Sequence, residues 1–224
     1  MNDLEAIKLV KEIFQLIKNA KSIADLEKVE NDKRIIKNKF DIDTYPKIEF
    51  SIKGSEIQFL IDESEMIDKD FNFSKDITSK LTDPISKLLF AIVWKQGDFL
   101  KIKHIVKGIQ DCDNEDSDQD EAFVFHQFGK YLTKKQGEPI IDQHVIRAFL
   151  IYRLDDFSRT TKFRQIAGIN KKYKQTIEEY KRWLDSDELT KELRNQSDYA
   201  YFIDKLLFAT GKTIKLKKPK KQKS

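Results

Sequence analysis

The sequence predicts a mainly α-helical protein, in which a helical core follows an N-terminal helix and a β-hairpin. Apolar residues recur at helical spacing through most of the chain after residue 76. Helix start and stop signals, such as Asp83-Pro84 and Gly97, interrupt that pattern at intervals. Alternation of apolar and polar residues is confined to residues 47–61. The 224 residues include 16 Phe and are 39% hydrophobic, which suits one domain with an extension or two small domains.

The N-terminal region, residues 1–70, combines two periodicities. Residues 3–19 have the pattern of an amphipathic helix, and residues 22–30 that of a second, shorter one. In residues 47–61 the side chains alternate around Gly54-Ser55, which predicts a β-hairpin. A lone hairpin is marginally stable in water, so we expect it to pack on the helices or to pair through its edge with a protein partner.

The helical core is expected over residues 71–211. Its predicted helices span 83–96, 98–109, 122–132, 143 onward, 171–184 and 197–210, and Gly211 is the expected stop of the last. An acidic run from Asp111 to Glu121 holds seven carboxylates in eleven residues. The remaining residues, 212–224, contain seven Lys and are expected to be a disordered lysine-rich tail.

Composition narrows the class of protein. No apolar run reaches the roughly 20 residues of a membrane span, so no membrane partner is expected. The first residues lack the basic and then apolar order of a signal peptide, and the single cysteine, Cys112, excludes an internal disulfide. We therefore expect a cytoplasmic protein. A net charge of +4 does not by itself require a nucleic-acid partner.

Asp142 is the residue to which the sequence assigns chemistry. Pro139 presets an extended entry, and Asp142 then stands at the N-cap position of an apolar helical stripe. The helix dipole favours a negative charge there. One interpretation is a structural cap, and the other is a reactive carboxylate. Metal and cofactor sites are not expected, because the three His are isolated and one Cys cannot form a structural zinc site.

Residues 139–147, Pro-Ile-Ile-Asp-Gln-His-Val-Ile-Arg, resemble the Pro-x-x-Asp-x-His-Val-x-Arg segment of the helix-hairpin-helix DNA glycosylase superfamily. Residues 199–212 also resemble the closing helix of uncharacterised bacterial proteins thought to share that fold. The resemblance implies that Asp142 is the catalytic carboxylate and faces the sugar of a flipped-out nucleotide. A flipped base needs a pocket. The candidates for contact with it are Trp94, Phe125, His126, His144 and Trp183, and the candidates for DNA contact are Lys130, Lys134, Lys135 and Arg147.

Two departures from the family pattern refine this expectation. Bifunctional members carry a lysine about eighteen residues before the Asp, where this chain has Val124. A monofunctional enzyme that uses water therefore fits better than a Schiff-base lyase. The Gly-rich hairpin that holds a DNA phosphate is absent, and the acidic run stands in its place.

Three functions remain open at this stage. The first is a DNA glycosylase that acts in bacterial DNA repair or anti-phage defence. The second is a non-catalytic module that binds nucleic acid or protein on the same fold. The third is a structural interaction protein that pairs through the hairpin edge. The aromatic candidates and His144 also have an ordinary interpretation as packing residues.

Overall fold

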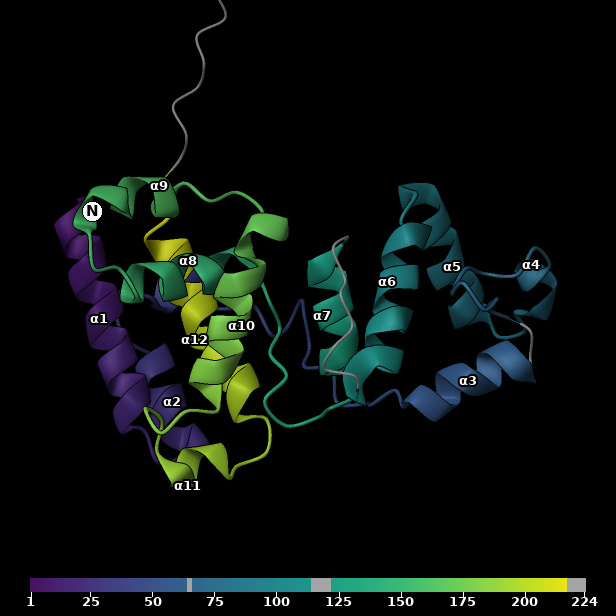
Figure 1. Ribbon diagram of the computed structural model, residues 1–224, viewed down its shortest axis with the longest axis horizontal. Helices are drawn as coiled ribbons and strands as arrows, with labels where there is room; N and C mark the ends of the chain where they lie inside the picture. The colour runs from purple at the N-terminus through teal and green to yellow at the C-terminus, as the bar shows by residue number, and fades with distance from the viewer. Residues whose placement is uncertain (64–65, 114–121, 217–224) are drawn as a thin grey trace, which may run out of the picture. The chain divides into compact units, whose positions relative to one another are not determined.

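The computed structural model describes residues 1–63, 66–113 and 122–216. The chain divides into two compact units (Figure 1). Unit 1 comprises Met1–Lys47 and Pro139–Ser224, and unit 2 comprises Ile48–Glu138. Both units are built from helices, and the part of the chain that is described contains no strand, so the mainly α class is confirmed. The division differs from the expected boundary at residue 70, because residues 48–70 group with the helices that follow them.

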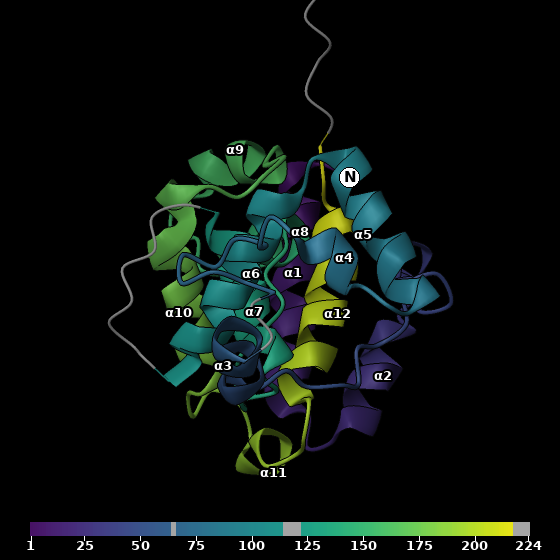
Figure 2. The same cartoon turned by 90° about the vertical axis from the view of Figure 1, so that its right-hand side faces the viewer.

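Unit 1 joins the two ends of the chain. Its helices are α1 (Asp3–Asn19), α2 (Ile23–Glu30), α8 (Gln143–Tyr152), α9 (Thr160–Arg164), α10 (Lys174–Leu184), α11 (Lys191–Arg194) and α12 (Tyr199–Thr213), with short 3-10 turns at Ile36–Asn38, Phe157–Arg159 and Lys171–Tyr173. The yellow helix α12 packs against α8 and α2, and α1 packs against α8 (Figures 1 and 2). Residues 143–152 and 199–213 therefore form the centre of this unit.

The predicted stripe of α1 is the first layer of the unit 1 core. Asn2 and Glu5 form a reciprocal capping box at its start. Phe14 is fully buried and stacks on Tyr152 with ring centroids 3.9 Å apart. Phe149 and Trp183 complete this aromatic cluster at 6.3 and 5.0 Å from Phe14. The expected helix over residues 3–19 is thus confirmed, and its apolar face is what joins it to α8.

The prediction that Gly211 ends the last helix is wrong, because α12 continues to Thr213. Its role is to allow close approach to α8: a Cβ atom at this position would lie 1.9 Å from the carbonyl oxygen of His144. The start of the lysine-rich tail is also ordered. Ile214 is fully buried, and the Leu216 N–H donates to the Arg164 carbonyl at 3.0 Å. Residues 217–224, the rest of the expected disordered tail, lie outside the described residues.

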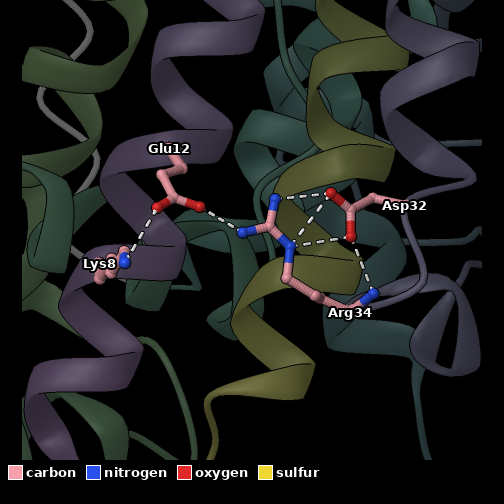
Figure 3. A network of polar contacts seen from close by, with 4 residues as sticks. All are labelled: Lys8, Glu12, Asp32 and Arg34. Atoms are coloured by element: carbon pink, nitrogen blue, oxygen red, sulfur yellow. Dashed lines mark hydrogen bonds and ion pairs between the residues drawn. The ribbon is translucent and has the colours of Figure 1, made fainter.

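A polar network links α1 to the segment after α2 on the surface of unit 1 (Figure 3). The guanidinium of Arg34 pairs with Asp32 at 2.6 Å and also with Glu12, while Lys8 lies 4.0 Å from Glu12. These side chains are partly exposed, so the network contributes little beyond local order.

Unit 2 contains α3 (Gly54–Asp62), α4 (Ile77–Lys80), α5 (Pro84–Gln96), α6 (Phe99–Gln110) and α7 (Phe123–Leu132), with a 3-10 turn at Asp111–Asp113. The two helices expected over residues 83–110 are confirmed. Asp83 caps α5 by accepting from the Ser86 N–H at 2.8 Å, and Gly97 ends it in the left-handed conformation with φ of 71°. Helices α6 and α7 pack side by side (Figure 1).

The predicted β-hairpin over residues 47–61 is wrong. Gly54 begins helix α3, and the Glu56 carboxylate accepts from the Lys53 N–H at 2.8 Å to cap it. Ile57 is buried on one side of α3, whereas Phe59 is exposed. The extended residues before α3 bond to α7 instead, through the Ile52 N–H and the Leu132 carbonyl at 3.0 Å. These residues therefore offer no strand edge at which the expected protein partner could pair.

Within the described residues, the longest apolar helices fall short of what a bilayer crossing requires.

Candidate functional site

The candidate site lies at the start of α8 in unit 1. Asp142 is the N-cap of this helix, as predicted, and its Oδ1 accepts from the His144 backbone N–H at 2.5 Å. The side chain is half-buried. Its second oxygen, Oδ2, makes no hydrogen bond to any residue that the structure describes. The cap interpretation is therefore confirmed, and the cap still leaves one carboxylate oxygen available to a ligand.

Asp204 of α12 is a second carboxyl group close to Asp142. Its Oδ2 accepts from the Ile140 N–H at 2.7 Å, and its Oδ1 accepts from the Tyr180 hydroxyl at 2.6 Å. Burial, aided by repulsion from Asp142, raises the pKa of Asp204 to about 8, although its two hydrogen bonds oppose the shift. Asp204 is thus mostly protonated at neutral pH. It fixes the backbone two residues before Asp142 without adding a second negative charge.

Arg147, in the second turn of α8, is fully buried. Its Nη1 donates to the Gly211 carbonyl at 2.8 Å and to Nδ1 of His144 at 2.5 Å, and its Nη2 donates to the Ile166 carbonyl. Burial lowers the pKa of Arg147 to about 10, so it remains charged at neutral pH. The expectation that Arg147 contacts DNA is corrected here, because its guanidinium is enclosed by protein carbonyls and does not reach a phosphate. It is a buried countercharge to Asp142.

His144 is buried beside Arg147 and meets the edge of the Phe208 ring at 5.0 Å. Burial lowers the pKa of His144 against the attraction of the Asp142 carboxylate, so the ring is neutral at pH 7. Because Arg147 can only donate, Nδ1 of His144 must accept, and the ring proton is on Nε2. This geometry makes His144 a packing and hydrogen-bonding residue and leaves it unsuited to the role of general base.

The aromatic candidates for base stacking are divided between the two units. Trp183 is only 3% exposed and belongs to the unit 1 core with Phe14 and Tyr180, so it is not offered to a ligand. Trp94 is 66% exposed on α5 of unit 2. Phe125 is half-buried on α7, with the Lys101 ammonium 5.5 Å from its ring centre. Only Trp94 and Phe125 therefore present surface to solvent within their own unit.

The remaining candidates also belong to unit 2. His126 is buried and lies 3.0 Å from Asp111, and burial lowers its pKa. The ammonium of Lys134 donates to the Ile48 carbonyl at 2.5 Å, and that of Lys135 to the Cys112 carbonyl at 3.1 Å. These two lysines tie the turn after α7 to neighbouring backbone. Lys130 stands half-buried on α7.

Within unit 1, the structure thus brings together Asp142, His144 and Arg147 from the predicted set and adds Asp204, Tyr180 and Gly211. Local sequence patterns did not reveal the added residues. Each of them contacts α8 or the residues just before it from more than thirty positions away in the sequence. One signal for Asp204 was available in the sequence. The apolar spacing of α12 places Asp204 on the buried face of that helix, where a carboxyl group is uncommon. No group of His, Cys, Asp and Glu suited to a metal ion occurs among the residues described.

Comparison of the chain with protein-family models, curated proteins and solved structures gives no match. Function must therefore be argued from the site itself.

Proposed function

We propose that the protein is a monofunctional DNA glycosylase, in which Asp142 promotes hydrolysis of the N-glycosidic bond of a damaged or modified base. The observation that carries the proposal is that only one of the two oxygens of this carboxylate is hydrogen-bonded within the described structure. One oxygen is anchored on the His144 N–H at 2.5 Å, and the other is without a protein partner in the described structure. Departure of a base leaves positive charge on the sugar, and a fixed carboxylate stabilises such charge.

The neighbours of Asp142 support this role. Asp204 holds the Ile140 backbone at 2.7 Å and is kept mostly protonated by burial, so it positions Asp142 without competing for the sugar cation. Two nearby carboxyl groups with different protonation states are a common arrangement where one must act as an anion. Arg147, buried and charged on the same helix, supplies a countercharge to Asp142. Asp142 is then free to orient or deprotonate the attacking water.

The lysine chemistry favours hydrolysis over a lyase reaction. Val124, at the position of the family's nucleophilic lysine, lies on α7 and cannot form a Schiff base. Lys134 and Lys135 are bonded to backbone carbonyls. We therefore propose that the product is an abasic site with an intact strand, and that the role is DNA repair or anti-phage defence.

The test is Asp142→Asn, assayed on DNA that carries damaged and modified bases. Asn is also a good N-cap, so folding should be retained while the negative charge is lost. We expect base release to fall by about 10²–10³-fold, the usual loss for one preorganised electrostatic group. Asp83→Asn is the matched control, because Asp83 also caps a helix, with its carboxylate 2.8 Å from the Ser86 N–H. It should release base at the parental rate.

Two results would contradict the proposal: parental activity in Asp142→Asn, or borohydride trapping of a covalent protein–DNA adduct. The alternative is a non-catalytic module that binds nucleic acid or protein. The large apolar side chains exposed on α5 favour it, because such surfaces often mark protein contacts. On this alternative the parent would bind without releasing base, and Asp142→Asn would bind equally well.

A further inference from the structure

Helix α5 leaves an apolar surface uncovered in unit 2. Four large side chains, Ile85, Leu88, Leu89 and Ile92, are 64%, 57%, 57% and 44% exposed. Their spacing of three, one and three residues places them along one side of the helix, and we call them the α5 stripe. A different side of α5 faces the unit: Phe90 meets Phe73 and Phe99 with ring centroids 5.9 and 5.2 Å apart. The helix is therefore apolar on two sides and covered on one.

An uncovered stripe of this size often marks a functional surface. Each of its side chains exposes on the order of 100 Å², so the stripe exposes roughly 400 Å² in one patch, the size of the largest apolar patch on many proteins, which is often functional. Helices that are apolar on several sides are normally buried. Charge is also sparse: Lys87 and Lys95 are the charged residues of α5, in a chain in which 36% of residues are charged. This composition indicates a contact surface.

The order of residues in the stripe fits a second copy of the chain as its occupant. The spacing of 85, 88, 89 and 92 reads the same in both directions. A two-fold axis between positions 88 and 89 therefore places Ile85 against Ile92 of a second copy, and Leu88 against Leu89, with every apolar residue facing another. Two-fold interfaces between identical chains require this kind of self-complementary surface.

The charges at the helix ends agree with the same antiparallel arrangement. Asp83 lies at the start of α5 and Lys95 in its last turn. In an antiparallel pair, the carboxylate of each copy lies near the ammonium of the other. The two helix dipoles then oppose each other favourably. Parallel pairing would instead bring Asp83 next to Asp83 and Lys95 next to Lys95.

We propose that the α5 stripe is a homodimer interface, in which two copies of the chain pair their α5 helices antiparallel about residues 88 and 89. The roughly 400 Å² contributed by each copy is about half of what a standard stable interface buries per partner. The dimer is therefore concentration-dependent and dissociates on dilution. This pairing is independent of the proposed chemistry at Asp142.

The first experiment measures the mass of the full chain in solution as its concentration is raised through the micromolar range. The parent should shift from 26.4 kDa toward twice that mass. Leu88→Asp should remain at 26.4 kDa at every concentration, because it places two carboxylates at the centre of the contact. Leu4→Asp is the matched control, since Leu4 on α1 is 72% exposed and outside the stripe. It should dimerise like the parent.

A second experiment tests the register and does not depend on a disruptive charge. Ile85→Cys mixed with Ile92→Cys should form a disulfide-linked dimer on mild oxidation. Ile85→Cys alone should link far more slowly, because its two copies would lie about 10 Å apart along the helix, beyond disulfide reach. Cys112 is buried and serves as a common background. A monomeric parent, a dimeric Leu88→Asp, or efficient linking of Ile85→Cys with itself would overturn the proposal.

Discussion

Units 1 and 2 use the same device to bring two helices together. In unit 1, Gly211 of α12 faces α8, and a Cβ atom there would lie 1.9 Å from the His144 carbonyl oxygen. In unit 2, Gly108 of α6 faces α7, and a Cβ atom there would lie 2.0 Å from the His126 carbonyl oxygen. In both units a glycine meets the backbone of a histidine on the opposite helix. The absence of a side chain is thus what sets each crossing.

The two units differ in what surrounds the glycine crossing. In unit 1 the pair is enclosed by other elements, and Phe14 of α1 and Ile177 of α10 are fully buried around it. In unit 2 the neighbouring helix α5 has no buried residue. The same crossing therefore produces a closed core in one unit and leaves an apolar helix face open in the other.

Each unit carries its own reporter. Trp183, buried in the unit 1 core, gives a fluorescence signal for that unit once Trp94 is replaced by Phe. Cys112, the single cysteine, is buried in unit 2 and reacts with thiol reagents only when that unit opens. The two signals allow the comparison to be tested one unit at a time.

The largest effect is expected from Gly211→Ala. The added methyl group overlaps backbone, which cannot rotate aside, so α8 and α12 must separate and the core must loosen. We expect a loss of about 3 kcal/mol or more in the free energy of unfolding of unit 1. The measurement is urea denaturation followed by Trp183 fluorescence. Gly168→Ala is the control, because nothing lies within 4 Å of a Cβ atom there, and it should change stability by less than about 0.5 kcal/mol.

Gly108→Ala extends the same test to unit 2, where it should accelerate Cys112 labelling and leave the Trp183 transition in place. If Gly211→Ala matched Gly168→Ala in stability, the close crossing in unit 1 would be disproved.

An intermediate effect is expected from Asp204→Asn, which should change how the free energy of unfolding of unit 1 depends on pH. The pKa of Asp204 is raised from an ordinary 3.8 to about 8 in the folded chain, so the group favours folding most below 3.8. That contribution is lost as pH rises toward 8, because the unfolded chain releases the proton first. Unit 1 of the parent should therefore lose stability between these values. Asp204→Asn mimics the protonated group and should flatten the dependence, measured by urea denaturation at pH 5 and pH 8. An equally steep loss in the variant would refute this assignment.

The smallest effect is expected from His126 in unit 2. Here stability should fall as pH falls, the opposite of the pH dependence expected from Asp204. Burial lowers the pKa of His126 below 6.5 in the folded chain, so its contribution is present above 6.5 and lost as pH falls. The hydrogen bond to Asp111 at 3.0 Å opposes the shift and keeps the effect small. Cys112 labelling, normalised to the unfolded chain at each pH, should accelerate below pH 6.5. His126→Gln should remove most of this acceleration, and labelling that stays independent of pH in the parent would count against it.

Local signals in the sequence predicted the features that local interactions create. Asp83, Gly97 and Asp142 cap or end their helices as expected, because each acts on backbone within three residues. The helix over residues 3–19 followed from its apolar period in the same way. The hairpin prediction failed because Ile57, Leu60 and Ile61 also have helical spacing. The Glu56 carboxylate caps the helix that forms instead.

The candidate site was predictable only in part, for a related reason. Asp142 was singled out by a nine-residue pattern, and its predicted N-cap position is confirmed. The bond from Ile140 to Asp204 spans 64 positions, and the burial of Arg147 depends on carbonyls from Gly211 and Ile166. No local pattern specifies such contacts. They arise when α12 closes on α8, which is also what turned the predicted DNA-binding Arg147 into a structural residue.

The division of the chain also bears on the order in which it folds during synthesis. Unit 2 is complete once residue 138 has been made, whereas unit 1 needs α12, which ends at Thr213. At the usual rates of translation those 75 further residues take roughly 4–15 s. During that interval α1, with its fully buried Phe14 and Ile17, has no completed partner. Newly made chains should therefore present unit 2 in native form before unit 1, and a ribosome stalled after unit 2 would leave α1 exposed to chaperones.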